Sequence, residues 1–436
     1  MKLRSLFLAG LAVMAMASCS NEDDAIVNGG ENAAKDAALQ FSIGFPQTTR
    51  ATTASGDKSD EGLSCEQKVN TISFVLKYND NTPTAVYDFD NNTEAAPGFT
   101  QEGLIIKTEK VEVNSGIAKI FVFINPVTKI TTENYANLQE TATYSNMDDL
   151  GDIANPKDSK FLMFGEGSCT IKGGQDNEAD VTVSRIAAKL AEQTAKDKEF
   201  TIENSTDKFG SAIKVKLSEY SYVNLNKTTN VTNSTTIFTP ANTGYFQYFK
   251  EEQAYQTFDG LTTIKEMNVE EANQVTYCLE NNNAAAPTMI LYKAQITEFP
   301  NYTEGNNFYI DADGILYPSF DVMNAKDGKF FGQLTNKEIY TGIDNQTALS
   351  DNSSYEDFNK YGIQKYTKGI CYYRAEIKTG AETKIVHNNY YKLSVSKITE
   401  LGDPGTNIPT PGNPLTYLKL NITVAPWTVW NNDIIL

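Results

Sequence analysis

The stretch Leu39-Gln40-Phe41-Ser42-Ile43-Gly44-Phe45 decides the fold class of this 436-residue chain. Large apolar side chains occupy every second position, and polar or small residues occupy the positions between them. This period of two is typical of a β-strand with one face in a protein core and the other face near solvent. The sequence therefore predicts a strand here, and a strand needs a sheet in which to pair.

The segment that follows this strand is polar. Residues 46–56 are mostly small and polar and have no apolar pattern, which is typical of an exposed segment open to proteases. Arg50 is the first arginine after Arg4, so a trypsin-like cut between Arg50 and Ala51 would release the predicted strand. The loss of that strand would leave a groove in the sheet, into which a strand of another chain could pair.

The composition of the whole chain favours an all-β fold. Tyrosine and phenylalanine are abundant, at 23 and 22 residues, while long segments with a helical period are scarce. Residues 72–78 alternate as a clear strand, and 117–124 form a nearly continuous apolar run typical of a central strand. At about 150 to 200 residues per domain, the length predicts two domains or a little more. We place them at 51–195 and 196–414.

The net charge excludes two classes of partner. The chain carries a formal charge of −18 at pH 7. A surface this acidic argues against binding nucleic acid and against electrostatic binding to an anionic membrane.

The first 19 residues have the pattern of an export signal. Lys2 and Arg4 precede an apolar run over 6–17, which is too short to span a bilayer as a mature helix. The run closes with Met16-Ala17-Ser18-Cys19, which resembles the lipobox of a bacterial lipoprotein, with Cys19 carrying the lipid and acidic residues at 22–24 as a surface-export signal. The alternative is an ordinary secretory signal followed by a chance cysteine. Residues 20–50 would then be a propeptide that contains the first strand.

Four more cysteines remain, at Cys65, Cys169, Cys278 and Cys371. No two of them have a C-x-x-C spacing and the chain has a single histidine, which argues against a zinc or redox site. An exported chain permits disulfides, and the simplest of three pairings joins Cys65 with Cys169 and Cys278 with Cys371. Free buried thiols are the alternative, and the sequence leaves both open.

A second alternating stretch lies near the C-terminus. Leu418, Leu420, Ile422 and Val424 alternate with polar residues, after a linker over 404–414 that contains four prolines. A strand that hangs on such a linker, within a terminal segment over 415–436, can leave its own sheet and join another one. Pairing within its own domain is equally consistent with the pattern.

No catalytic residues, metal ligands or cofactor can be assigned. The chain lacks Gly-x-Ser-x-Gly, a phosphate-binding glycine loop and a metal-ligand cluster. Residues 88–92 and 311–314 resemble parts of calcium loops, but without the final glutamate we expect solvated turns. A surface glycan-binding lipoprotein is the alternative function, although both tryptophans lie beside the terminal strand and not on a separate platform.

Short segments along the chain resemble the major fimbrial subunits of Bacteroidales, the type V pilins, and in particular the branch that forms shorter fimbriae. Besides the lipobox and Thr49-Arg50-Ala51, these segments are 181–190, 277–281, 366–374, 386–393 and 424–427. Each is short, and the specificity of the resemblance comes from their order over nearly the full length.

The resemblance implies two transthyretin-like β-sandwich domains and a structural role without enzyme activity. It also implies that an arginine-specific protease cuts between Arg50 and Ala51 and removes the strand with Leu39, Phe41, Ile43 and Phe45. The donor strand with Leu418, Leu420, Ile422 and Val424 of an identical subunit would then fill the groove. Further expected partners are tip and anchor fimbrial proteins and receptors on host or bacterial surfaces, and a tip-subunit role is the alternative within this family.

Overall fold

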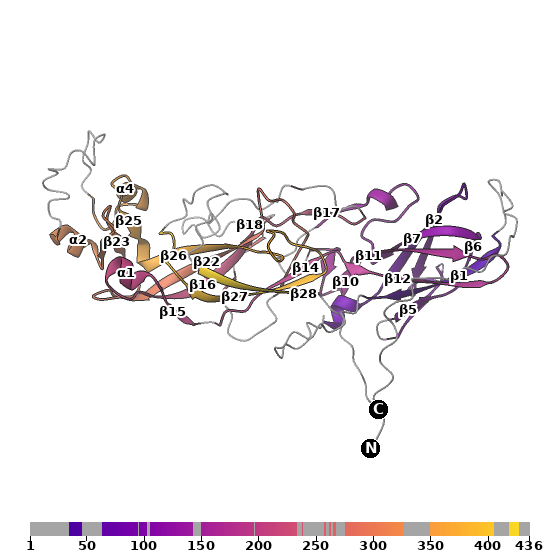
Figure 1. Cartoon of the computed structure of the whole chain (residues 1–436), viewed down its shortest axis with the longest axis horizontal. Helices are drawn as coiled ribbons and strands as arrows, with labels where there is room; N and C mark the ends of the chain where they lie inside the picture. Colours follow the sequence, from indigo (N-terminus) through magenta and orange to yellow (C-terminus); the bar gives the residue numbers. More distant parts are fainter. Residues whose placement is uncertain are drawn as a thin grey trace, which may run out of the picture.

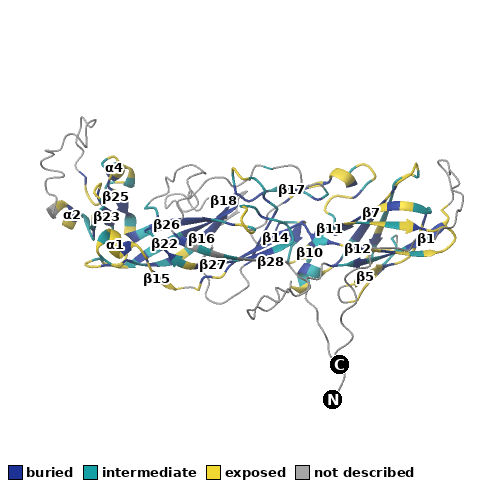
Figure 2. Cartoon of the chain, viewed as in Figure 1, coloured by how far each residue is buried: buried dark blue, intermediate teal, exposed yellow. Residues whose placement is uncertain are grey.

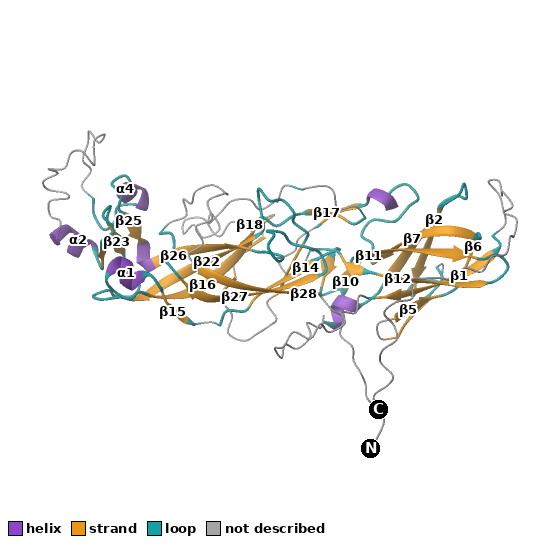
Figure 3. Cartoon of the chain, viewed as in Figure 1, coloured by secondary structure: helices purple, strands orange, loops and turns teal. Residues whose placement is uncertain are grey.

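The computed structural model describes residues 35–45, 63–94, 96–102, 105–142, 150–195, 197–232, 238, 257–258, 261–262, 265–266, 275–326, 349–404 and 418–426. Strands dominate this part of the chain, and its helices are short (Figure 3). The predicted all-β fold class is confirmed. The molecule is elongated, with β1 near one end and α2 near the other (Figure 1).

The N-terminal half consists of two sheets that pack face to face. In the first sheet the order is β12-β1-β5-β4, and β6 also pairs with β1. Its strands are β1 (Ala37–Gly44), β4 (Phe99–Glu102), β5 (Ile105–Thr108), β6 (Val111–Val113) and β12 (Asp176–Thr182). The second sheet, in the order β13-β11-β7-β2-β3, has the strands β2 (Thr71–Tyr78), β3 (Ala85–Asp90), β7 (Gly116–Ile124), β11 (Met163–Ile171) and β13 (Ser184–Arg185). Phe41 of β1 stacks on Phe74 of β2, which joins the two sheets through the core.

The C-terminal half has the same two-sheet construction. Its first sheet has the order β21-β14-β27-β28, with β14 (Ala188–Glu192), β21 (Val275–Cys278), β27 (Asn389–Ile398) and β28 (Leu418–Pro426). Its second sheet has the order β15-β16-β22-β26, with β20 beside β16, and contains β15 (Glu199–Thr201), β16 (Lys214–Val223), β20 (Lys265–Glu266), β22 (Met289–Glu298) and β26 (Ile370–Glu376). A hydrogen bond from Tyr292 of β22 to Glu192 of β14 joins these sheets.

The strand β14 lies on the other side of the expected domain boundary. A first domain over 51–195 would include it, yet β14 pairs with β21 and β27 of the C-terminal half. The polar run after Glu192 has the composition of a linker, whereas all five residues of β14 are buried. The chain therefore crosses between the halves at 186–187.

Smaller elements complete the described chain. A ribbon of β8 (Gln139–Thr141) and β17 (Thr228–Asn230) joins the two halves. Two further hairpins are β9 (Ala154–Asn155) with β10 (Lys160–Phe161), and β18 (Thr257–Phe258) with β19 (Leu261–Thr262). The short helices are η1 (Ser64–Gln67), η2 (Tyr135–Asn137), α1 (Ser205–Phe209), α2 (Phe320–Lys326), α4 (Tyr355–Asn359) and η4 (Thr367–Gly369). A small sheet of β23 (Phe308–Ile310), β24 (Leu316–Tyr317) and β25 (Gln364–Tyr366) lies with α2 and α4 at the far end.

The buried apolar side chains form one continuous cluster through both halves. Figure 2 shows buried residues along the strands of both sandwiches. A second, smaller cluster around Tyr309 and Phe358 belongs to the small sheet at the far end. The halves therefore share a core, and β1 lies within it.

Candidate functional site

The strand β1 occupies the middle of its sheet. On one side it runs parallel to β12 over seven residue pairs, and on the other it is antiparallel to β6 and then to β5. Within the described part of the chain, β12 joins this sheet through β1 alone. Removal of β1 would therefore leave two unpaired strand edges that face each other across the width of one strand.

The inward face of β1 is buried as predicted. Leu39, Phe41 and Ile43 have no exposed surface, and Phe45 is 5% exposed. The ring of Phe41 packs between Phe74, which it stacks on, and Phe89, which it meets edge to face. These four side chains fill a continuous apolar trough between the two sheets.

The outer edge of the trough is interrupted between β5 and β6. Thr108, at the end of β5, fills the interruption: its hydroxyl accepts a hydrogen bond from the Phe41 backbone N–H at 3.0 Å. The Gln40 side-chain amide donates to the Thr108 carbonyl oxygen at 2.7 Å. On this edge the middle of β1 is therefore bound by Thr108, while the ladder to β12 continues on the other edge.

The start of β1 is held by Asp36. Its carboxylate accepts hydrogen bonds from the Ser115 backbone N–H at 2.6 Å and from the Ser115 hydroxyl at 2.7 Å. Its carbonyl oxygen accepts a bond from the Gly174 N–H at 2.7 Å. The hydroxyl of Ser115 holds the pKa of the Asp36 carboxyl below its usual range.

The predicted donor strand is present as β28, at the edge of the C-terminal half. It pairs antiparallel with β27 along its whole length, from Leu418 opposite Ile398 to Pro426 opposite Asn389. Leu418 is buried, whereas Leu420 and Ile422 are only half-buried. In this structure β28 therefore pairs within its own chain, which is one of the two arrangements left open by the sequence, and its donor role stays a prediction.

Several predicted residues lie outside the described part of the chain. These are Cys19 of the lipobox and the cleavage site at Arg50 and Ala51. The side chain of Val424 is also outside it, although its backbone pairs with Tyr391.

The four cysteines that could have formed disulfides are free thiols. Cys278 and Cys371 are buried in different sheets of the C-terminal half, and Cys65 and Cys169 are partly buried. The disulfides Cys65–Cys169 and Cys278–Cys371 are therefore not present in the structure. It has the free thiols that the sequence left open as the alternative. Burial raises the pKa of the Cys169 thiol to about 11 and that of Cys371 to about 12.

A buried polar cluster at the junction of the halves was missed from the sequence. Glu66 of η1 is fully buried, and its carboxylate accepts hydrogen bonds from Lys189 Nζ at 2.8 Å and from the Tyr277 hydroxyl at 2.6 Å. Arg185 Nε donates to the Glu66 carbonyl oxygen at 2.9 Å, and burial lowers the pKa of Arg185 to about 10. η1 is the first described element after the predicted cleavage segment, so this cluster ties it to both halves.

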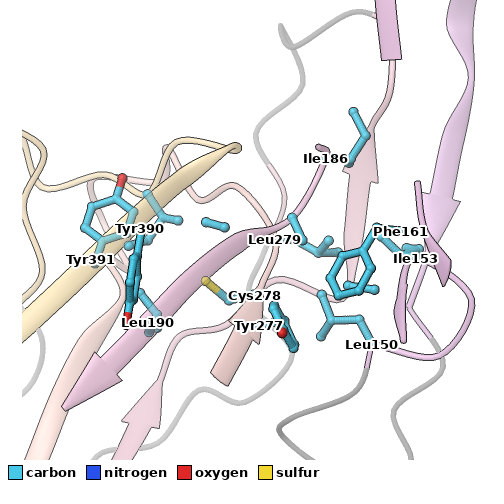
Figure 4. Close-up of a cluster of buried hydrophobic side chains, with 14 of the residues drawn as sticks. Leu150, Ile153, Phe161, Ile186, Leu190, Tyr277, Cys278, Leu279, Tyr390 and Tyr391 are labelled. Atoms are coloured by element: carbon cyan, nitrogen blue, oxygen red, sulfur yellow. The ribbon is translucent and has the colours of Figure 1, made fainter. Parts of the chain in front are cut away.

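Apolar contacts surround the polar cluster. Figure 4 shows Leu150, Ile153 and Phe161 of the N-terminal half beside Tyr277 and Leu279 of the C-terminal half. The rings of Phe161 and Tyr277 meet edge to face, with centroids 5.2 Å apart. Three of the family-like segments converge here, since Asn388 Oδ1 accepts a bond from the Arg185 N–H and β21 pairs with β14. The presence of these three segments in the sequence was therefore the signal from which the junction could have been located.

The described residues contain neither a metal-ligand group nor a membrane-spanning helix. Among the described residues, no group of three or more histidine, cysteine, aspartate or glutamate side chains is placed to hold a metal ion. Asp311 instead accepts bonds from the Asp313 and Ile315 N–H groups and the Tyr317 hydroxyl within a turn. The turn was expected to be solvated, but Asp311 is buried in it. The same part of the chain contains no helix with the length and hydropathy needed to cross a membrane.

Comparisons with known proteins concern the C-terminal segment most directly. Residues 364–433, which include β26, β27 and β28, match the family described as "Major fimbrial subunit protein type IV, Fimbrillin, C-terminal". A stretch of 151 residues is 29% identical to the "Major fimbrium subunit FimA type-4" of Porphyromonas gingivalis strain W83 and 28% identical to a second protein of that name from the same species. Each match covers 32% of this chain and 36% of the relative, so the chain spans little more than a third of these relatives.

A solved structure resembles most of the chain in its fold. The fimbrilin of P. gingivalis W83 superimposes with a TM-score of 0.50 over 91% of this chain and 99% of its own, at 15% identity, which is a likeness of fold. The relatives are named as fimbrial subunits and not as enzymes. The C-terminal segment that carries β26, β27 and β28 is therefore similar to the C-terminal part of fimbrillins, and the chain resembles Bacteroidales major fimbrial subunits in part of its sequence and in its fold.

Proposed function

We propose that this chain is a structural subunit of a fimbrial shaft, and that subunits polymerise when proteolysis removes β1 and β28 of a neighbour takes its place. The central position of β1, with its inward face fully buried, carries the proposal, because removal of this strand would leave an apolar groove between two unpaired strand edges. The position of β1 directly before the predicted cleavage segment is the second support.

β28 lies at the edge of its sheet, whereas β1 lies in the middle of its own. This difference favours the insertion of β28 into the site that β1 leaves. Among the described strands, β28 pairs on one edge only, with β27, and Leu420 and Ile422 remain half-buried there. In the groove it would pair on both edges, and its apolar side chains would enter sites where Phe41 and Ile43 have no exposed surface. Counted from a fully exposed strand, four such side chains bury about 300 to 500 Å² of apolar surface, or roughly 8 to 12 kcal/mol before the cost of ordering the strand. The gain on exchange is smaller, because Leu418 is already buried beside β27. A polymer held in this way dissociates very slowly.

The proposed route begins at the cell envelope. The precursor is exported, lipidated at Cys19 and held at the outer membrane, and an arginine-specific protease cuts it between Arg50 and Ala51. The mature subunit then joins an extracellular fimbrium that supports adhesion and biofilm formation. Its partners are identical subunits, tip and anchor fimbrial proteins, and receptors on other surfaces.

The test is to digest recombinant residues 20–436 with an arginine-specific protease. We expect a new N-terminus at Ala51 and SDS-resistant ladders in unboiled samples. Deletion of 415–436 should abolish the ladders without affecting cleavage, and an Arg50→Ala variant should remain an uncut monomer. A chain that is cut at Arg50 but stays monomeric at high concentration would contradict the proposal and favour a monomeric surface-binding lipoprotein.

A further inference from the structure

The outer rim of the β1 groove carries an excess of negative charge. Asp176, Glu178 and Asp180 are the exposed positions of β12 beside Ala38, Gln40 and Ser42 of β1. Lysines from the other side of the groove reach across: Lys107 of β5 lies 3.0 Å from Glu178, and Lys110 pairs with Asp176. No ion pair to Asp180 is found in the described part of the chain. Glu112 of β6 is a further exposed carboxylate, opposite Ala38 on the other edge of β1. The rim therefore has four carboxylates and two ammonium groups, above a strand that is itself uncharged between 37 and 45.

β28 carries the complementary charge. Between 418 and 426 its one charged residue is Lys419, which alternates in the sequence with Leu418 and Leu420. When the leucines face the core, the position of Lys419 faces the rim. From the net negative charge of the rim, and on the basis of the proposed function, we infer that the groove binds β28 of a second copy in the register that places Lys419 at the position of Gln40. There it lies opposite Glu178, which Lys107 also contacts, and diagonal to Asp180.

The shape of the groove selects this register. Leu418 and Leu420 then replace Leu39 and Phe41, and Ile422 and Val424 replace Ile43 and Phe45. A shift of two residues in one direction would put Leu418 in the site of Ala37, which holds a single methyl group. A shift of two residues in the opposite direction would place the polar Thr416 in the buried site of Leu39. The outer position of Gly44 is open, since a Cβ atom built there meets nothing within 4 Å, so Thr423 fits over it.

The backbone of the groove selects the direction. β1 is parallel to β12 on one side and antiparallel to β5 and β6 on the other. Parallel and antiparallel ladders place their hydrogen-bonding groups differently. A strand inserted in the reverse direction would be antiparallel to β12 and parallel to β5 and β6. It would also misplace the backbone N–H group that, at the Phe41 position, donates a hydrogen bond to the Thr108 hydroxyl. β28 therefore enters in the direction of β1.

Disulfide cross-linking tests the register. Lys419→Cys is combined in turn with Asp176→Cys, Glu178→Cys and Asp180→Cys, and each chain is cleaved and oxidised after assembly. Because a disulfide needs Cβ atoms about 3.5 to 4.5 Å apart, neighbouring positions on the same face are out of range. The samples are boiled without reducing agent, so that only covalently linked subunits remain as ladders. We expect such ladders from the combination of Lys419→Cys with Glu178→Cys only. The single variant Lys419→Cys is the control for the native thiols.

Reversal of the charges at positions 178 and 419 tests whether the rim of the groove recognises Lys419. Glu178→Lys and Lys419→Glu should each slow ladder formation by about two- to fivefold, as expected for an exposed ion pair, and the double variant should recover most of the rate. Cross-links at Asp176→Cys or Asp180→Cys, no cross-link at all, or a double variant as slow as the product of the two singles would overturn the inference. Absence of any ladder from the unaltered, cleaved chain would instead contradict the proposed function.

Discussion

The ring of Phe41 stacks on the ring of Phe74, with their centroids 3.6 Å apart and their planes inclined by 14°. Both side chains have no exposed surface. One ring lies in the strand proposed to leave the protein, and the other lies in a strand that stays. The precursor and the polymer should therefore depend differently on Phe41.

Replacement of Phe41 should weaken the precursor but not the polymer. Phe41→Ala removes a buried ring, so we expect the free energy of unfolding of the precursor to fall by about 3 to 5 kcal/mol, measured by urea denaturation. The temperature at which mature polymers dissociate in SDS should not change, because the mature subunit lacks β1. Ser42→Ala, on the outer face, is the matched control and should cost under about 0.5 kcal/mol. A change in the polymer would mean that β1 is retained after cleavage.

The Asp36 carboxylate should slow the departure of β1 after cleavage. Asp36→Ala removes two hydrogen bonds to Ser115, worth about 1 kcal/mol at an exposed site, so release should be roughly fivefold faster. A dye on the 20–50 fragment would report its release. Asp158→Ala, at an exposed aspartate outside this sheet, should leave the rate unchanged.

The pH dependence of release gives an independent check on Asp36. The pKa of its carboxyl is lowered by Ser115, so the stabilisation is present above the ordinary value of 3.8 and is lost as the pH falls through the lower folded value. Release from the unaltered chain should therefore accelerate in that acidic range, and release from Asp36→Ala should lack this component. Identical profiles for the two chains would show that Asp36 does not hold the strand.

Local patterns predicted the strands, but not their partners. The alternation of Leu39, Phe41, Ile43 and Phe45 correctly indicated a strand with one buried face, because the period of two is a property of neighbouring residues. The parallel pairing of β1 with β12 joins residues more than 130 positions apart, and no local pattern encodes it.

The junction of the halves could not be predicted for the same reason. Glu66 stands in a polar stretch and has the local pattern of an exposed acid, and only the fold brings Lys189 and Tyr277 to it. The pairing of the short strand β14 with β21 and β27 was likewise not visible in the sequence, since five residues are too few to show which sheet buries them.

Loss of the Glu66 charge should destabilise the whole chain. Glu66→Gln would leave the ammonium of Lys189, which is 4% exposed, without its carboxylate partner. Breaking a buried ion pair on one side costs about 3 to 5 kcal/mol, which urea denaturation would measure as a loss in the free energy of unfolding. Lys397→Met breaks an exposed pair with Glu203 and should cost under about 1 kcal/mol.

A double variant separates the ion pair from the packing around it. Because Glu66 and Lys189 contact each other, Glu66→Gln with Lys189→Met should cost less than the sum of the two single changes. Additive costs would show that the pair does not stabilise the junction as a unit.

Glu192 should make the C-terminal half less stable as the pH rises. Burial raises the pKa of this carboxyl to about 7, although Thr194 and Tyr292 donate hydrogen bonds that lower it. The folded value is above the ordinary one of 4.5, so the stabilisation is fully present below 4.5 and is lost as the pH rises through 7. At about 1.4 kcal/mol per unit of pKa, the free energy of unfolding should fall by about 3 kcal/mol in total.

The variant Glu192→Gln should remove this dependence, with urea unfolding at pH 5.5 and pH 8 as the measurement. Glu203→Gln, at an exposed glutamate, should keep the slope of the unaltered chain. Glu192 lies opposite Leu393 of β27, and Leu393 lies opposite Ile422 of β28, so weakening of this sheet also loosens the proposed donor strand. Ladder formation after cleavage should then be faster at pH 8 than at pH 5.5 in the unaltered chain, but nearly equal at the two values in Glu192→Gln. Equal pH dependence in both chains would show that the ionisation of Glu192 does not control the release of β28.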